Sequence, residues 1–396
     1  VVVNGEIVKK RADQLVVGDA LVTMIGQNIH GNKVQMASVD VTAATSYKHV
    51  KLPTILTPQV ARFLGYHVAE GNIYARTYGS MYGFQLGFGL LDFDTINDFE
   101  SCLIGLVGDR YTKSRTDTAI RFSISSKHLY MWIKNIDCGG KSGTKKIPKV
   151  IMSSPLSIKR HFLSALFEGD GTICSAKNRK GYKLSYTSKS EKLVRQISAE
   201  MLNIGILGYI SSETRKDYGT FWVWTARRRK DLETFQREID FISERKKSKL
   251  QNALDTVEID RCNRFYDGFE AEINRILPLT KRKAKDKLRE CQRGVRFNEN
   301  RLMLIEEHIR GDLKFLRDSK CITTRVRSVI NGKREQVYDI YEPVNSNMVI
   351  NGVVILDCNF GCLYRIGPRR FVEYANLYDD NGEPRLDFAR DIIAKF

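Results

Sequence analysis

The pattern of hydrophobic and polar positions changes character twice along this chain. Residues 1–25 and 321–357 contain short apolar runs separated by turn-forming pairs such as Asn4-Gly5, Gly18-Asp19 and Asn351-Gly352. Such pairs favour tight connections between strands. Residues 53–250 instead mix helical and strand patterns. The chain therefore predicts a small all-β unit into which a longer α/β unit has been inserted.

The α/β pattern occurs twice. Apolar helices that end in an acidic residue and a glycine are predicted at residues 63–71 and 163–171. Strands are predicted near residues 72–78, 83–90, 110–115 and 118–125 in the first copy, and near residues 173–177, 182–187, 208–214 and 219–225 in the second. A repeat of about 100 residues is too long for a solenoid unit. We expect a duplicated domain that folds as a pseudo-dimer within a monomeric chain.

Small residues recur four positions apart in both predicted helices. They are Gly65 and Ala69 in the first helix, and Ala165 and Gly169 in the second. Small residues let two backbones approach closely. If the helices pack side by side, their last carboxylates, Glu70 and Asp170, lie within a few ångströms of each other.

Two facing carboxylates repel unless a divalent cation lies between them. Oxygen ligands suit Mg²⁺ (or Mn²⁺), and we expect Glu70, Asp170 and the neighbouring Gly169 to hold the metal. Metal-assisted hydrolysis of a phosphodiester is the corresponding chemistry. In the alternative, each acid is a solvated carboxylate at a helix end before a glycine cap.

The charge of the chain favours a polyanionic partner. The formal net charge is +18 at pH 7, and residues 358–396 carry as many acidic as basic side chains, so the excess belongs to residues 1–357. Nucleic acid is the first candidate. The eight cysteines form no CxxC pair, which gives no sign of a zinc knuckle or a disulfide framework. Without an 18-residue apolar run or a signal peptide, we expect a cytoplasmic protein with no membrane partner.

Four segments together resemble the LAGLIDADG homing endonucleases. FLGYHVAEG and FLSALFEGDG are similar to the two signature helices of that family. KKIP at residues 145–148 is similar to the K-x-I-P block of intein endonucleases, and implies that Lys145 is an active-site lysine. FISERK at residues 241–246 is similar to the segment that closes the second half, and implies a second lysine at Lys246 or Lys247. These lysines would stabilise charge at a scissile phosphate; the alternative is that all three are exposed and solvated.

The resemblance implies a fold and a partner. The family fold has two pseudo-symmetric αββαββα halves, whose four-stranded sheets form a saddle across double-stranded DNA. Basic residues on the strands would contact phosphates and bases in the major groove. The expected DNA contacts are Arg76, Lys113, Arg115, Arg121, Lys183, Arg215 and Lys216.

The terminal segments resemble the splicing blocks of inteins. VYDIYEPVNSNMVINGVVILDC is similar to the C-terminal blocks, with Cys358 at the position of the downstream nucleophile. Leu356 and Asp357 stand where His and Asn are usual. Aspartate can still break the chain by cyclising to an anhydride, but the general acid is missing. We therefore expect slow or conditional splicing.

The opening segment KKRADQLVVGDALVT is similar to a stretch that inteins show twice. We take it as the second copy and expect the first nucleophile upstream of Val1. Thr45 and His49 are the nearest substitute for a TxxH block, although the alternative of an exposed linker histidine is simpler.

Residues 358–396 resemble the fingers helix of family A DNA polymerases. Asn359-Phe360-Gly361 and Tyr364 match that pattern, while Arg365 replaces the usual glycine. The resemblance implies that Tyr364 belongs to a nucleotide site of a host polymerase, whose flanking exteins are then partners of the intein.

The sequence thus predicts an α+β multidomain chain, in which a split all-β Hint splicing domain contains a LAGLIDADG endonuclease. The expected parts are the N-terminal Hint portion (1–50), the endonuclease (51–250), a basic helical segment (251–316), the C-terminal splicing strands (317–357) and the host fragment (358–396). The basic run at residues 281–289 is interpreted as a solvated helix face. The alternatives are a splicing-impaired intein whose centre only binds DNA, and a free-standing homing endonuclease.

Overall fold

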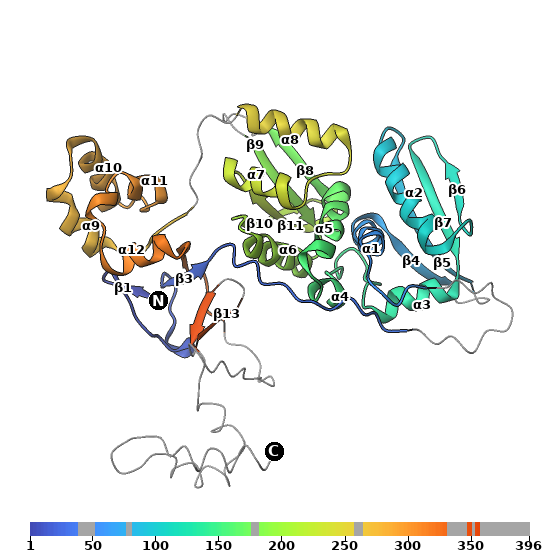
Figure 1. The fold of residues 1–396 in the computed structure, drawn as a ribbon, viewed down its shortest axis with the longest axis horizontal. Helices are drawn as coiled ribbons and strands as arrows, with labels where there is room; N and C mark the ends of the chain where they lie inside the picture. Colours follow the sequence, from blue (N-terminus) through green and yellow to red (C-terminus); the bar gives the residue numbers. More distant parts are fainter. Residues whose placement is uncertain are drawn as a thin grey trace, which may run out of the picture.

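The computed structural model describes residues 1–38, 52–76, 81–175, 182–256, 264–330, 347–350 and 353–356. Figure 1 shows two α/β halves and a terminal unit that combines a sheet with short helices. None of the helices in these ranges is long and apolar enough to cross a membrane.

Both ends of the described chain contribute to one antiparallel sheet. Its strands are β1 (Val2–Val3), β2 (Glu6–Ile7), β3 (Ala20–Met24), β12 (Cys321–Arg325), β13 (Asn347–Ile350) and β14 (Val353–Leu356). The turn between β1 and β2 has positive φ angles at Asn4 (51°) and Gly5 (90°), as expected for an Asn-Gly hairpin turn. β3 pairs with β1, β12 and β14. The residues between β3 and β12 are therefore an insertion within this sheet.

Short helices cover the terminal sheet and share its core. They are α9 (Glu270–Ile276), η2 (Leu277–Leu279), α10 (Arg282–Gln292), α11 (Glu299–Met303), η3 (Glu306–His308) and α12 (Gly311–Asp318), while η1 (Ala12–Gln14) lies before β3. Phe269 and Leu313 are buried in one cluster with Val2 and Ala20. The helical segment is thus part of the terminal unit and not a separate module. In α10, Ala284 and Leu288 face inward, which leaves the charges of the basic run on the outer face.

The two α/β halves have the same order of elements. The first comprises α1 (Pro58–Glu70), β4 (Asn72–Arg76), β5 (Met81–Gly89), α2 (Phe93–Val107), β6 (Thr112–Arg115), β7 (Ala119–Ser125) and α3 (Lys127–Asn135). The second comprises α5 (Leu156–Asp170), β8 (Gly171–Ser175), β9 (Tyr182–Ser188), α6 (Glu191–Ile204), β10 (Tyr209–Arg215), β11 (Gly219–Ala226) and α7 (Arg229–Glu238). The sheet orders β4-β5-β7-β6 and β8-β9-β11-β10 are equivalent. The predicted αββαββα repeat is confirmed.

Three boundaries differ from the sequence expectation. α1 and α5 begin at Pro58 and Leu156, earlier than the apolar runs that predicted them. Thr57 caps α1 by accepting from the Val60 N–H, and proline at the first helical position suits a helix start. After α7, helix α8 (Glu244–Thr256) crosses the expected boundary at residue 250, and α4 (Lys149–Met152) precedes α5.

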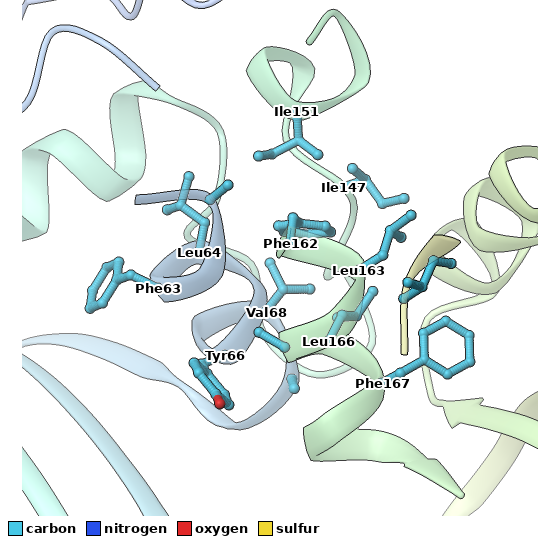
Figure 2. Packing of buried hydrophobic residues seen from close by; sticks show 14 of the residues in the cluster. Phe63, Leu64, Tyr66, Val68, Ile147, Ile151, Phe162, Leu163, Leu166 and Phe167 are labelled. Carbon is cyan, nitrogen blue, oxygen red and sulfur yellow. The ribbon is translucent and has the colours of Figure 1, made fainter. Parts of the chain in front are cut away.

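α1 and α5 pack against each other along their small residues (Figure 2). A Cβ added at Gly65 would lie 2.3 Å from the Phe162 carbonyl oxygen, and one added at Gly169 would lie 2.5 Å from Ala69 Cβ. The two backbones are therefore as close as glycine allows. Apolar side chains on both sides of this contact, such as Phe63 and Leu166, join the cores of the two halves into one buried cluster.

Candidate active site

Each of the paired helices ends in a carboxylate and continues directly into a strand. Glu70 is the last residue of α1 and Asp170 the last of α5. The following glycines have extended backbones, with φ of −77° at Gly71 and −82° at Gly171. A Cβ at Gly71 would lie 2.2 Å from His67 Nδ1, and one at Gly171 would lie 2.5 Å from the Phe167 carbonyl oxygen. These glycines thus permit a sharp turn from helix to strand and do not form left-handed caps.

The surroundings of both carboxyl groups disfavour their charged forms. Burial and, next to it, the charge of Glu70 raise the pKa of Asp170 to about 7. Burial by neighbouring groups also raises the pKa of Glu70, although the residue as a whole is exposed to solvent.

The carboxylates suit a hard divalent cation. The Tyr186 hydroxyl donates to Asp170 Oδ2 at 3.1 Å. No cluster of three or more His, Cys, Asp or Glu side chains suited to a metal occurs within the ranges described above. A cation would therefore depend on these two carboxylates and on backbone carbonyls such as that of Gly169, in the last turn of α5, where carbonyl groups have no intrahelical partner.

A lysine lies at the end of each helix. Lys145 Nζ donates to the Ala69 carbonyl at 2.6 Å, and Lys246 Nζ donates to the Gly171 carbonyl at 2.8 Å and also to Glu168 O. Burial lowers the pKa of both lysines, while the carboxylates raise it, those of Asp170 and Glu70 in the case of Lys145. The solvated interpretation is therefore wrong for these two residues. Lys247 instead pairs with Glu244 at 2.9 Å near the surface, so Lys246 is the lysine that faces the helix ends.

Glu168 is a buried acid whose role the sequence analysis missed. Its Oε2 accepts from the backbone N–H groups of Ile242 at 2.8 Å and Ser243 at 3.1 Å. Its Oε1 accepts from Ser243 Oγ at 2.7 Å and lies 3.9 Å from Lys246 Nζ. Glu168 therefore fixes the start of α8 beside the site. An acidic residue within the apolar run of α5 was the available signal.

The strand register decides which predicted DNA contacts lie on the open face of the first sheet. Buried Phe122 marks the face that α2 covers. Lys113 pairs in register with Phe122, and its Nζ donates to Glu100 of α2 at 2.6 Å. Arg115 pairs with Ile120, which packs against the same core. Lys113 and Arg115 are therefore on the wrong face for groove contacts, because a strand alternates its side chains between faces.

Arg121 lies on the opposite face from its neighbour Phe122, in register with Gly87. Lys183 lies on the corresponding face of the second sheet, since Leu184, the next residue of β9, is buried in the core. In β10, Ile210 pairs with buried Trp224, so Arg215, five residues further along the same strand, lies on the open face. Arg215 stacks on the Phe221 ring at 4.5 Å. Lys216 is exposed in the turn after β10.

Several predicted residues have no described side chain. Arg76 belongs to β4 by its backbone, in register with Met81, and Leu356 ends β14. Asp357, Cys358 and Tyr364, as well as Thr45 and His49, lie outside the described residues.

A family comparison matches the second half. Residues 157–240 fit the family model described as a LAGLIDADG-like domain. The chain contains a LAGLIDADG-like domain. The matched range runs from the start of α5 to the end of α7 and includes Asp170, and the repeated order of elements extends the same architecture to the first half.

The chain is also similar to parts of longer proteins. A DNA polymerase of Thermococcus litoralis is 29% identical over 307 residues, which are 76% of this chain and 15% of that protein. A DNA gyrase protein of Mycobacterium gordonae is 32% identical over 184 residues, covering 44% of this chain and 32% of that protein. An uncharacterized protein of Methanocaldococcus jannaschii is 30% identical over 156 residues, which cover 38% of this chain and 17% of that protein. The chain thus spans at most 32% of the length of these relatives.

Solved structures of homing endonucleases align with the central part. I-DmoI in complex with DNA and Ca aligns with a TM-score of 0.37 and 16% identity, over 48% of this chain and 96% of that chain. I-WcaI bound to its DNA recognition sequence aligns with a TM-score of 0.37 and 16% identity, over 53% of this chain and 95% of that chain. Both likenesses are weak.

Proposed function

We propose that this chain is a site-specific endonuclease that cleaves double-stranded DNA with a divalent metal ion. The observation that carries the proposal is the backbone contact between α1 and α5, which sets the ends of both helices beside each other with Glu70 and Asp170 as their last residues. The I-DmoI and I-WcaI proteins are named as bound to DNA, and I-DmoI structures were solved with Mn or Ca. The family match covers the half that carries Asp170.

Each group has a distinct task in this proposal. A bound Mg²⁺ would supply Lewis-acid activation of the phosphate and of water. Glu70 and Asp170, together with the Gly169 carbonyl, hold the cation. Lys145 and Lys246 stabilise the charge that develops at the scissile phosphates. The open faces of the two sheets, with Arg121, Lys183 and Arg215, bind the phosphate backbone and base edges.

The test is cleavage of a plasmid library that carries randomised inserts, with the full chain and Mg²⁺. We expect linear product from the wild type, and at least a hundredfold less from D170N and E70Q, because each removes a carboxylate from the metal site. The variant E191Q is the control, because the Glu191 side chain is 42% exposed, and it should cut normally. Wild-type protein that binds DNA in Ca²⁺ but never cuts it in Mg²⁺ would instead identify a DNA-binding module.

A second proposed activity is protein splicing. It is supported by the terminal sheet, in which β3 pairs with β12 and β14 across the whole insertion, and by relatives whose DNA polymerase or gyrase names belong to much longer proteins. In this proposal, Asp357 cyclises, Cys358 is the downstream nucleophile and residues 358–396, with Tyr364, belong to a family A DNA polymerase host.

Splicing is tested with a precursor that includes the upstream host sequence. We expect slow ligation in the wild type, none in C358A, and at least tenfold faster ligation in the double variant L356H/D357N, since it restores an imidazole and an amide. Mass spectrometry of the products measures the yield. Rapid, complete ligation of the wild type would show that His and Asn are dispensable here, whereas a chain that cuts DNA but never splices would be a free-standing homing endonuclease.

A further inference from the structure

The two segments that carry Lys145 and Lys246 each bind the half of the pseudo-dimer to which they do not belong. The segment with Lys145 follows α3 at the end of the first half, and the segment with Lys246 follows α7 at the end of the second half. Both lysines reach back to the signature helix of their own half through their ammonium groups, Lys145 to the Ala69 carbonyl of α1 and Lys246 to the Phe167 and Glu168 carbonyls of α5.

The backbone around Lys145 is held by α6 of the second half. The Lys145 carbonyl accepts from Ser190 Oγ at 2.6 Å, and the Ile147 N–H donates to Gln196 Oε1 at 3.0 Å. Ser190 is fully buried and also accepts from the Leu193 N–H at 3.2 Å as the N-cap of α6. One hydroxyl thus fixes both the start of a second-half helix and the first-half lysine.

The backbone around Lys246 is held by the start of α2 in the first half. The Glu244 N–H donates to Asp94 Oδ2 at 2.9 Å, and Arg245 Nη2 donates to Asp92 Oδ1 at 2.7 Å. Thr95 Oγ1 of α2 also donates to Glu168 Oε1, at 3.3 Å. The start of α8 is therefore bound by carboxylates from both halves.

These contacts are reciprocal, because α2 and α6 occupy equivalent places in the repeat. We propose that Ser190 and Asp94 are positioning residues, each of which fixes the lysine of the opposite half. Neither half then has a correctly placed lysine without the other. This inference rests on the proposed nuclease function, in which a misplacement of about 1 Å costs up to about a hundredfold in rate.

The contacts themselves are tested by amide hydrogen exchange of the full chain, which needs no cleavage. S190A should speed exchange at residues 145–147 and leave residues 242–246 unchanged, whereas D94A should do the reverse. S126A is the matched control, since Ser126 caps α3 by accepting from the Leu129 N–H at 3.2 Å within its own half. S190T and D94N keep a hydroxyl and an acceptor oxygen, and should restore the protection.

The consequence for catalysis is tested on a cleaved duplex labelled separately on each strand. S190A should slow the nicking of one strand at least tenfold, and D94A that of the other strand, while S126A slows neither. Equal slowing of both strands by either variant, or unchanged exchange at the named segments, would overturn the proposal. If the wild type cuts no DNA, the nuclease function fails and the catalytic part of the inference with it, while the exchange result still decides whether the reciprocal contacts exist.

Discussion

At the residue scale, the chain maintains a carboxyl pair that its own fold disfavours. Burial and the charge of Glu70 both oppose ionisation of Asp170, while Lys145 and the Tyr186 hydroxyl favour it. Natural folds often lose stability where a site needs charges in close proximity. A bound cation would relieve this opposition, because it favours the charged form of both carboxylates.

The raised pKa of Asp170 predicts a pH-dependent stability difference. The neutral form is favoured in the folded state, so this contribution is complete below the ordinary pKa of 3.8 and is lost as the pH rises through about 7. D170N removes the effect and should be more stable than the wild type at pH 8.5, by up to about 4 kcal/mol. At pH 5 the difference should be much smaller.

Urea unfolding in EDTA at the two pH values measures this difference. E191Q provides the comparison, because Glu191 is exposed in its pair with Arg195. An equal gap between D170N and wild type at both pH values would show that the Asp170 carboxyl is not responsible.

At the scale of elements, periodicity predicted most of the two halves. The alternation of apolar residues located the strands to within a few residues, and small residues four apart predicted the contact between α1 and α5. Helix starts were missed because the first turns, PQVA in α1 and LSIK in α5, mix polar with apolar residues and precede the continuous apolar runs. Lys113 and Arg115 were misassigned because a side chain's face depends on register, and a shift of one residue reverses it.

The close contact between α1 and α5 predicts that a single added methyl group lowers the stability of the folded protein. G169A should lower the melting temperature strongly, since its Cβ would meet Ala69 Cβ at 2.5 Å and force the backbones apart. Overpacking of this kind costs about 1–3 kcal/mol. Differential scanning calorimetry is the measurement.

G105A is the matched variant in a helix interior. Its Cβ would meet only the flexible end of Gln59, and alanine gains about 1 kcal/mol of helix propensity over glycine. G105A should therefore be neutral or stabilising, and similar losses in both variants would argue against a tight helix contact.

The strand register also predicts which lysine contributes to DNA affinity. K183A should lower the slope of log affinity against log salt by about 0.9, the value for one lost phosphate contact. K113A should leave the slope unchanged, because Lys113 pairs with Glu100 on the helix-covered face. Fluorescence anisotropy with a duplex in Ca²⁺ between 50 and 200 mM salt, a range that resolves such contacts, measures both. A loss of slope in K113A alone would reverse the assignment of faces.

At the scale of the whole molecule, the segment that follows β3 and the terminal unit each contact the second half. Asn203 Nδ2 donates to the Ile29 carbonyl at 2.7 Å and its Oδ1 accepts from the Ile29 N–H at 3.1 Å. Glu299 of α11 accepts from Arg264 and lies 3.9 Å from buried Arg228. These ties were not predictable, because they join residues from distant parts of the chain that carry no shared pattern.

The shared sheet predicts that the terminal unit survives loss of the insertion. The Thr323 N–H donates to the Phe265 carbonyl at 2.8 Å, while Thr323 pairs with Val22. The chain thus leaves and re-enters the unit at neighbouring points. Replacing residues 26–263 with a short Gly-Ser linker should leave a cooperatively unfolding protein, as measured by circular dichroism. A chain with no thermal transition would show that the unit needs its contacts with the second half.

The long separation in sequence between β3 and its partner β12 also determines which parts of the chain can fold first during synthesis. Thr23 and Thr324, whose hydroxyls are hydrogen-bonded, are 301 positions apart. At about 5–20 residues per second, β3 leaves the ribosome roughly 15 to 60 s before β12 is made. Both α/β halves are complete by then. The enclosed part of the nascent protein can therefore fold first, while β3 waits for its partners β12 and β14 until translation is almost finished.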